Sequence, residues 1–171
     1  MSGVIDQKEI NDWVQRAKTD LNNKKWSSAS PVDAREYKNS FWGCFSPPDL
    51  CCITCCLPCV TFGKTHHRLR KNANMEGYET VNTSCISFYL ASCFGLHWVM
   101  QAMQAADVRE KYNLQGSCTG DLVKSFCCLC CSVVQAEKES LEREAEKGTV
   151  KEQYGGETMV MQGGQQPPQQ H

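Results

Sequence analysis

The sequence lacks the patterns that mark most enzymes. It contains no glycine-rich phosphate loop, no G-x-S-x-G motif and no paired-carboxylate pattern. Only four histidines are available as bases that could activate a thiol nucleophile. We therefore expect that the protein is not an enzyme.

A surplus of positive charge and a secretory signal are also lacking. The formal net charge is -1, whereas neutralising nucleic-acid phosphates needs an excess of Lys and Arg, so we expect no nucleic-acid partner. The opening stretch, MSGVIDQKEINDW, has charged residues and no apolar run, which predicts that no signal peptide is present. Ser2 stands where N-myristoylation needs glycine. We expect a chain made in the cytosol, where thiols stay reduced.

Cysteine, by contrast, is abundant, with 13 residues that all lie between Cys44 and Cys131. Metal ligation, S-acylation, packing and disulfides are four explanations for such a cluster. An odd number of cysteines cannot all pair within one chain, and a reducing compartment disfavours pairing. We therefore rank metal ligation first, S-acylation second, packing third and disulfides last.

Metal ligation is favoured because Cys-x2-Cys pairs are a common way to supply two ligands to zinc. Two such pairs follow one another in the first half of the chain, and two overlap nearer its C-terminus. They are Cys52 with Cys55, Cys56 with Cys59, Cys127 with Cys130, and Cys128 with Cys131. Residues three apart share one face of a helix, so either late pair could hold one ion.

S-acylation is the competing chemistry, because cysteines beside a hydrophobic segment are typical acceptors and two acyl chains anchor far better than one. The basic residues Lys64, Arg68, Arg70 and Lys71 would suit anionic headgroups on the cytoplasmic face of a membrane. An ordinary solvated helix face explains the same four residues equally well.

The hydrophobic pattern predicts a mainly α fold. Apolar residues from Ile10 to Leu21 recur at three- and four-residue spacing, which predicts an amphipathic helix docked on the body. We divide the chain into a polar lead-in with this helix (1–40), a small Cys-rich helical domain with hydrophobic helical segments (41–147), and a Gly/Gln/Pro-rich tail that we expect to be disordered (148–171).

The uncharged segment from Cys85 to Ala106, with Ser84 as the expected N-cap, supports two interpretations. As one helix it would extend about 33 Å, enough to cross a hydrocarbon core. Its polar residues, such as His97 and Gln101, equally favour a helix buried in a soluble core. A single span would separate the two Cys clusters, so a single span and a shared metal site exclude each other.

The segment from Asp121 to Gly148 is predicted to be one helix, capped by Asp121 and followed by Gly148. Leu122, Phe126 and Val133 fall on its apolar stripe. After the apolar half, charged residues of both signs dominate, which indicates a solvated face.

The run CCITCCLPCVTFG (51–63) resembles the signature of the placenta-specific-8 family: two adjacent cysteines, four residues, then Cys or Leu, Pro and Cys. Further matches are REKYNLQGSC and FCCLCCSVVQ, the latter ending at Gln135. Lys138 stands where family members often carry Arg. The resemblance covers roughly residues 41–141.

The resemblance implies a function that the residues alone do not. Plant members of this family include cell-number regulators and cadmium-resistance proteins linked to zinc and cadmium export, and members are commonly membrane-associated with no shared catalytic activity. We therefore expect a protein at the cytoplasmic face of the plasma membrane or another membrane that handles soft metal ions. Transport would require a homo-oligomer, because one or two helices cannot enclose a pathway. The alternative is a non-enzymatic growth regulator in which zinc is structural or the cysteines are acylated.

Soft thiolates prefer zinc, cadmium and copper(I) to hard cations, so zinc is the cofactor that we consider. The predicted metal ligands are Cys52, Cys55, Cys59, Cys128 and Cys131. Further candidate ligands are Cys51, Cys118, Cys127 and His66.

Overall fold

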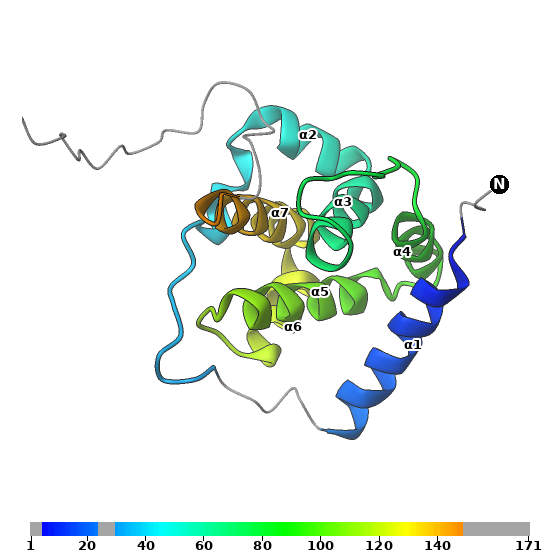
Figure 1. The fold of residues 1–171 in the computed structure, drawn as a ribbon, viewed down its shortest axis with the longest axis horizontal. Coiled ribbons are helices and arrows are strands. Elements are labelled where there is room, and N and C mark those ends of the chain that lie inside the picture. Colours follow the sequence, from blue (N-terminus) through cyan, green and yellow to red (C-terminus); the bar gives the residue numbers. More distant parts are fainter. Residues whose placement is uncertain (1–4, 24–29, 149–171) are drawn as a thin grey trace, which may run out of the picture.

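The computed structural model describes residues 5–23 and 30–148 of the chain. Seven α-helices and one short 3-10 helix account for its regular structure, and no strand occurs within these two ranges. The elements are α1 (Gln7–Asn22), η2 (Phe41–Phe45), α2 (Pro48–Cys56), α3 (Pro58–Arg70), α4 (Thr83–Cys93), α5 (His97–Tyr112), α6 (Cys118–Cys127) and α7 (Leu129–Glu146) (Figure 1). The predicted mainly α fold is confirmed, and the predicted tail lies outside the described residues from 149 onward.

The predicted amphipathic helix is α1, and it docks on the body as expected. Asp6 caps it by accepting a hydrogen bond from the backbone N–H of Lys8. Trp13, on its apolar face, is buried against Phe62 of α3 and Phe88 of α4. Stacking on Phe62, with ring centroids 5.6 Å apart, fixes α1 to the side of the helical body.

The segment from Cys85 to Ala106 is two helices, so the expectation of one continuous helix is wrong. The chain turns between α4 and α5, where Gly95 adopts φ of +69°, a conformation that suits a residue without Cβ. Asn82, and not Ser84, caps α4 by accepting from the N–H of Cys85 at 2.8 Å. Among the described residues, no helix combines the length and the apolar composition needed to cross a bilayer.

The segment from Asp121 to Gly148 is also two helices. Cys128 has extended backbone angles (φ -144°, ψ 89°), ends α6 and serves as the N-cap of α7. Ser117, not Asp121, caps α6. The break divides the predicted stripe, so Val133 is buried while Phe126 is exposed. The expected helix end just before Gly148 is confirmed.

The charged half of α7 is largely buried, so the expectation of a solvated face is wrong. Glu137 and Glu139 are inaccessible to solvent, and Glu144 is nearly so. Glu137 pairs with Arg68 of α3 at 2.6 Å and accepts from Thr65 at 2.8 Å. Arg68 is therefore neither solvated nor available to headgroups. The remaining basic residues of α3 and its end also reach acidic partners: Lys64 to Glu137, Arg70 to Asp107 and Lys71 to Glu9.

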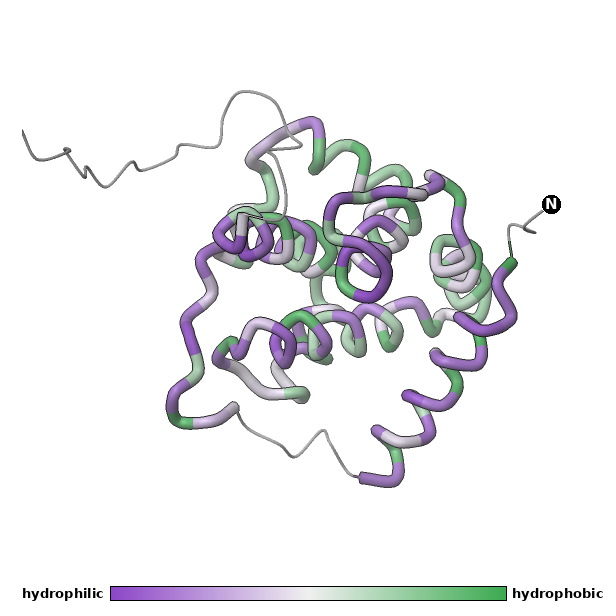
Figure 2. The backbone as a smooth tube through the Cα atoms, viewed as in Figure 1, coloured by the Kyte–Doolittle hydropathy of each residue, from purple (hydrophilic) through white to green (hydrophobic). Residues whose placement is uncertain are grey.

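The starts of α5 and α7 lie at one end of the molecule, because the two helices run side by side in the same direction. Gln101 near the start of α5 donates to Ser132, and Tyr112 at its end donates to Glu144. Three chain corners, α2–α3, α4–α5 and α6–α7, lie toward this end, and hydrophobic residues occur along α2 and α4 there (Figures 1 and 2). A ring contact between Trp98 and Phe126 joins two of them. We call this region the apolar end.

Candidate thiol site between η2, α2 and α7

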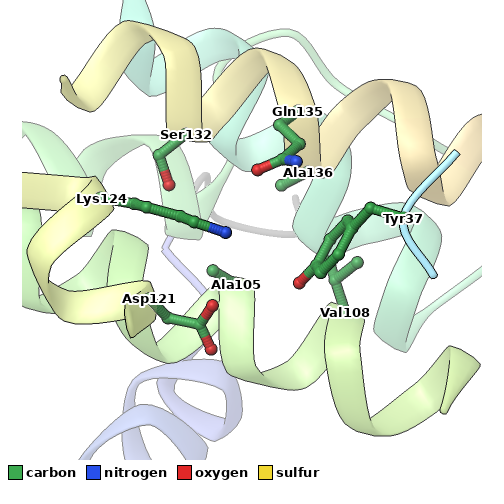
Figure 3. A pocket seen from close by; sticks show the side chains of 8 residues that line it. All are labelled: Tyr37, Ala105, Val108, Asp121, Lys124, Ser132, Gln135 and Ala136. Carbon is green, nitrogen blue, oxygen red and sulfur yellow. The ribbon is translucent and has the colours of Figure 1, made fainter. Parts of the chain in front are cut away.

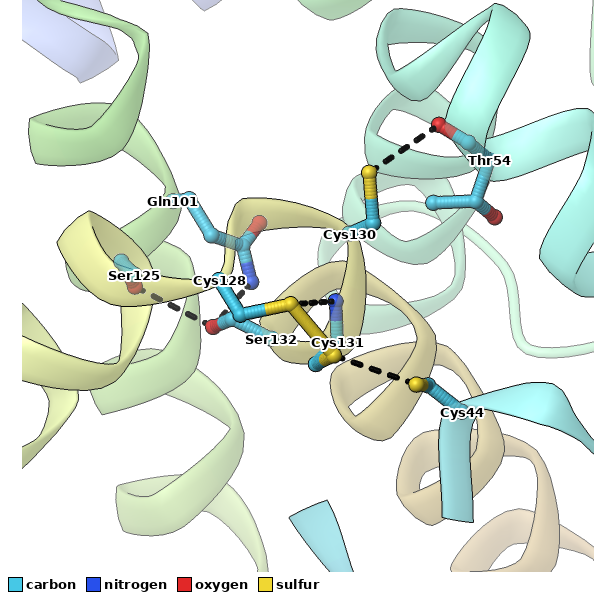
Figure 4. Close-up of a disulfide and its surroundings, with 8 residues drawn as sticks. All are labelled: Cys44, Thr54, Gln101, Ser125, Cys128, Cys130, Cys131 and Ser132. Carbon is cyan, nitrogen blue, oxygen red and sulfur yellow. Dashed lines mark hydrogen bonds between the residues drawn. A yellow bond between two sulfur atoms is a disulfide. The ribbon is translucent and has the colours of Figure 1, made fainter. Parts of the chain in front are cut away.

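The two Cys motifs, far apart in the sequence, meet where α2 packs on the first turns of α7. The thiol of Cys130 approaches the carbonyl oxygen of Thr54 at 4.0 Å (Figure 4). Cys44, on η2, contacts the same part of α7. Six sulfurs gather here, from Cys44, Cys51, Cys55, Cys128, Cys130 and Cys131. We call them the thiol site.

Three of these sulfurs form an inner group. Cys128 and Cys131 are joined by a disulfide, and the sulfur of Cys44 lies 3.1 Å from that of Cys131 (Figure 4). The group sits in an apolar cluster with Leu50 and Val134. Ranking disulfides last is therefore wrong for this pair, because the break at Cys128 brings two residues of one predicted helix face into bonding range.

The other three sulfurs form an outer group at the α2–α7 contact. Partial burial raises the pKa of the Cys130 thiol to about 11, and its hydrogen bond with Cys55 adds to the effect. Desolvation and a hydrogen bond with Cys55 also raise the pKa of Cys51. The raised pKa values keep the Cys51 and Cys130 thiols protonated at neutral pH, so a metal ion must displace their protons to bind them.

Two polar side chains of α7 hold the segment that carries Cys44. Lys138 donates to the carbonyl oxygens of Ser46 at 2.8 Å and Gly43 at 3.3 Å. Gln135 donates to the carbonyl oxygen of Asn39 at 2.8 Å. The Gln and Lys noted in the sequence thus position η2 against α7, on both sides of Cys44.

The remaining predicted ligands are spread around this site. Cys52 and Cys127 are exposed, and Cys118 lies at the start of α6. Cys59 forms a separate pair with Cys85, whose pKa is raised to about 12 by burial and by their hydrogen bond. In residues 5–23 and 30–148, no three His, Cys, Asp or Glu side chains are arranged to hold a metal ion.

His66 lies apart from the thiols, beneath α1. Its ring stacks on Trp13, and its Nδ1 is 2.9 Å from the hydroxyl of Ser84, which donates to Glu9. Burial, with a contribution from the charge of Arg16, lowers the pKa of His66 to about 3. This histidine is a neutral part of the α1 contact.

Sequence reasoning missed the central place of Cys44 and Cys130, and the pairing of Cys85 with Cys59. Cys44 stands alone in the sequence, seven residues before the first motif, and only the packing of η2 on α7 brings it to Cys131. Cys130 belonged to a Cys-x2-Cys pair with Cys127, but the chain break puts these two residues on different helices.

A small cavity lies elsewhere, between α5, α6 and α7, and Tyr37 and Asp121 are among its lining residues (Figure 3). Its volume of about 10 Å³ suits one water molecule. Burial raises the pKa of Asp121, although Arg109 beside it acts in the opposite direction. The cavity is too small for an organic substrate.

The family follows from the region that contains this site. A model of the PLAC8 family matches residues 37–139, which include every cysteine of the chain. The chain belongs to the PLAC8 family. The predicted resemblance is confirmed, and α1 lies outside the matched region.

The relatives of this PLAC8 protein include several plant proteins. Protein PLANT CADMIUM RESISTANCE 1 of Arabidopsis thaliana is 33% identical over 122 residues, which cover 67% of this chain and 74% of the relative. Protein PLANT CADMIUM RESISTANCE 2 of the same species is 30% identical, covering 67% and 73%. Cell number regulator 10 of Zea mays is 28% identical, covering 64% and 67%. No solved structure matches the chain.

Proposed function

We propose that this protein contributes to tolerance or handling of soft metal ions, zinc or cadmium, by binding them as cargo through thiols. The observation that carries the proposal is the convergence of both Cys motifs on the thiol site between η2, α2 and α7. The names of its relatives, which include cadmium-resistance proteins, support the same function.

The chemistry of the site suits exchangeable binding. Each protonated thiol becomes a ligand only when it releases its proton, so affinity rises with pH and binding acidifies the solution. Of the predicted ligands, Cys55, Cys128 and Cys131 belong to the thiol site. Cys52 is exposed on the same helix, where it could receive an ion from solvent.

We also propose that the protein works at a membrane surface, bound through the apolar end. Phe94 and Phe126 are 79% and 70% exposed. Leu57 and Leu96 are exposed at the neighbouring corners. Exposed apolar side chains at neighbouring corners are typical of surfaces that meet protein partners or lipid. Three exposed cysteines lie on the same corners and are acceptors for S-acylation: Cys56, Cys93 and Cys127.

A second candidate function is regulation of growth, in which the metal holds the fold. The relatives named as cell number regulators favour it. The thiol site joins η2, α2 and α7, so an ion bound there would staple three elements. In that case metal removal would lower the melting temperature, whereas exchangeable cargo would leave the metal-free fold intact.

Cadmium tolerance of cells that express the full chain tests the first function. We expect Cys55→Ser to remove most of the tolerance that the wild type confers, while Cys93→Ser, remote from the thiol site, retains it. Equal tolerance with both variants at equal protein levels would reject thiol-based handling at this site. Melting temperatures of purified Cys55→Ser, with and without zinc, separate lost handling from a lost structural ion.

A further inference from the structure

The inner sulfur group brings together cysteines that no sequence motif places side by side. Its three sulfurs come from two elements, Cys44 from η2 and Cys128 and Cys131 from α7. Cys44 and Cys131 are 3% and 5% exposed. Half-buried Cys128 is the member that solvent reaches.

As the described residues stand, these three side chains are not arranged to hold an ion, but the separation of two of their sulfurs approaches that of a metal site. Metal–sulfur bonds of about 2.3 Å in a tetrahedron place the sulfurs about 3.8 Å apart. The sulfurs of Cys44 and Cys131 are 3.1 Å apart, and the Cα atoms of Cys128 and Cys131 are separated by 5.4 Å. The separation of the Cys44 and Cys131 sulfurs is thus about 0.7 Å shorter than that spacing, and reduction would free the Cys128 side chain to turn toward them.

In the described state, however, two of the three sulfurs are bonded to each other. A disulfide sulfur is a poor ligand, because the thiolate is the form that binds metal. Only Cys44 then offers a thiol, so the disulfide closes the group to soft ions.

We infer that Cys44, Cys128 and Cys131 form a redox-gated site for one soft metal ion, closed by the Cys128–Cys131 disulfide and opened by its reduction. The inference rests on the proposed function, and it adds a redox state that regulates metal binding at the thiol site. A dithiol reductant delivers two electrons and two protons to the sulfur–sulfur bond, leaves as its own disulfide and yields two thiols. A divalent ion then takes the place of three thiol protons, which pass to solvent.

The position of the gate at the start of α7 fits this role. The backbone N–H of Cys131 donates to the sulfur of Cys128 at 3.4 Å. A thiolate or a metal–thiolate at Cys128 receives the same hydrogen bond and faces the positive end of the helix dipole. Because Lys138 fixes the backbone on both sides of Cys44, the third ligand stays in place when the disulfide opens.

The test compares cadmium binding by the full chain in two redox states. Protein is either reduced with dithiothreitol and desalted without oxygen, or oxidised, and peptide mass spectrometry establishes whether Cys128 and Cys131 are bonded. Cadmium is titrated against a competing chelator, and the ultraviolet thiolate-to-cadmium band reports the bound ion. We expect the reduced protein to hold one tight ion that the oxidised protein lacks.

Two variants assign the tight ion to the inner group. Cys44→Ala should weaken it by about 100-fold or more, since loss of even an outer-shell partner costs roughly 10–100-fold. Cys93→Ser is the matched control and should bind as the wild type does. Cys128→Ser cannot form the disulfide, so its weaker binding should be the same in both redox states. Circular dichroism of each variant verifies that it folds.

Equal tight binding by the reduced and oxidised proteins, or by Cys44→Ala and Cys93→Ser, would overturn the inference. In those cases cadmium binding itself persists, and the proposed function stands on the outer thiols. If the reduced protein held no cadmium at all, both the inference and the proposed function would fail.

Discussion

The two halves of α7 solve different packing problems with opposite chemistry. The first half places thiols and Val133 and Val134 against η2, α2 and α5, beside the apolar end. The second half buries acidic side chains against the basic residues of α3 and α5. The first half of α7 therefore holds the thiol site beside the apolar end. The second half is held in the protein by buried ion pairs.

The comparison teaches that burial in this protein does not follow polarity. An acidic side chain such as Glu137 is stable inside only because Arg68, Lys64 and Thr65 surround it. Neutral thiols and a disulfide carry no charge and need no such partners. Three predictions test this division, from the largest expected effect to the smallest.

The largest effect is expected from breaking the buried ion pair. Arg68→Met leaves Glu137 without its main partner inside the protein, so we expect it to lower the free energy of unfolding by about 3–5 kcal/mol. Arg70→Met is the matched control, because Arg70 is partly exposed in its pair with Asp107 and its loss should cost less than about 1 kcal/mol. Urea denaturation of both variants measures the difference.

A double variant makes this prediction sharper. Arg68→Met with Glu137→Leu removes both charges and should recover most of the stability lost in the single variant. If Arg68→Met and Arg70→Met were equally stable, the charged half of α7 would not depend on its pairs, and the division between the halves would fail.

The second effect concerns pH. The pKa of His66 is lowered from 6.5 to about 3, mainly by burial. Below pH 6.5 the unfolded chain therefore binds a proton that the folded chain does not, and stability falls as the pH falls. Between pH 7 and 5 we expect a loss of about 2 kcal/mol from this group, at 1.36 kcal/mol for each pKa unit.

Thermal or urea unfolding at several pH values measures this loss. His66→Gln should remove most of the slope between pH 7 and 5, whereas His67→Gln should remove less, because the hydrogen bond between His67 and the carbonyl oxygen of Glu76 raises the pKa that burial lowers. The raised pKa values of Cys51 and Cys130 mean that these two thiols add no slope there. An unchanged slope in His66→Gln would show that the contact between α1 and α3 does not depend on a neutral histidine.

These tests also indicate how far the sequence could lead. Hydrophobic periodicity predicted the helical class and α1, and the Cys motifs predicted the family. Periodicity did not predict the breaks at Gly95 and Cys128, because the apolar pattern continues across both positions, although Gly95 itself is a poor helix former. Burial of Glu137 depends on Arg68, 69 positions away, a pairing that local charge patterns do not contain.

The candidate site shows the same limit. Its thiols were predicted as residue types, but their grouping depends on tertiary contacts. Cys44 joins Cys131 through η2, and Cys130 joins Cys55 through the packing of α2 on α7. Spacing alone therefore grouped Cys52 and Cys59 with the thiol site, whereas in the structure Cys52 is exposed and Cys59 pairs with Cys85.

The smallest effect on stability is expected at the apolar end. There a substitution should change membrane binding more than it changes the free energy of unfolding. Phe94 contributes little to the core, so Phe94→Gln should change the free energy of unfolding by less than about 0.5 kcal/mol.

If this end lies on a membrane, the same variant should bind vesicles of phosphatidylcholine and phosphatidylserine about 10-fold more weakly, because full burial of one Phe contributes about 1.5–3 kcal/mol. Val32→Gln is the matched control, since Val32 is fully exposed but lies in the loop before η2. Vesicle co-sedimentation measures the binding. Equal binding by the wild type and Phe94→Gln would mean that this end does not face lipid, and a shift of the wild type to a dimer in gel filtration, lost in Phe94→Gln, would assign the same surface to a second copy of the chain.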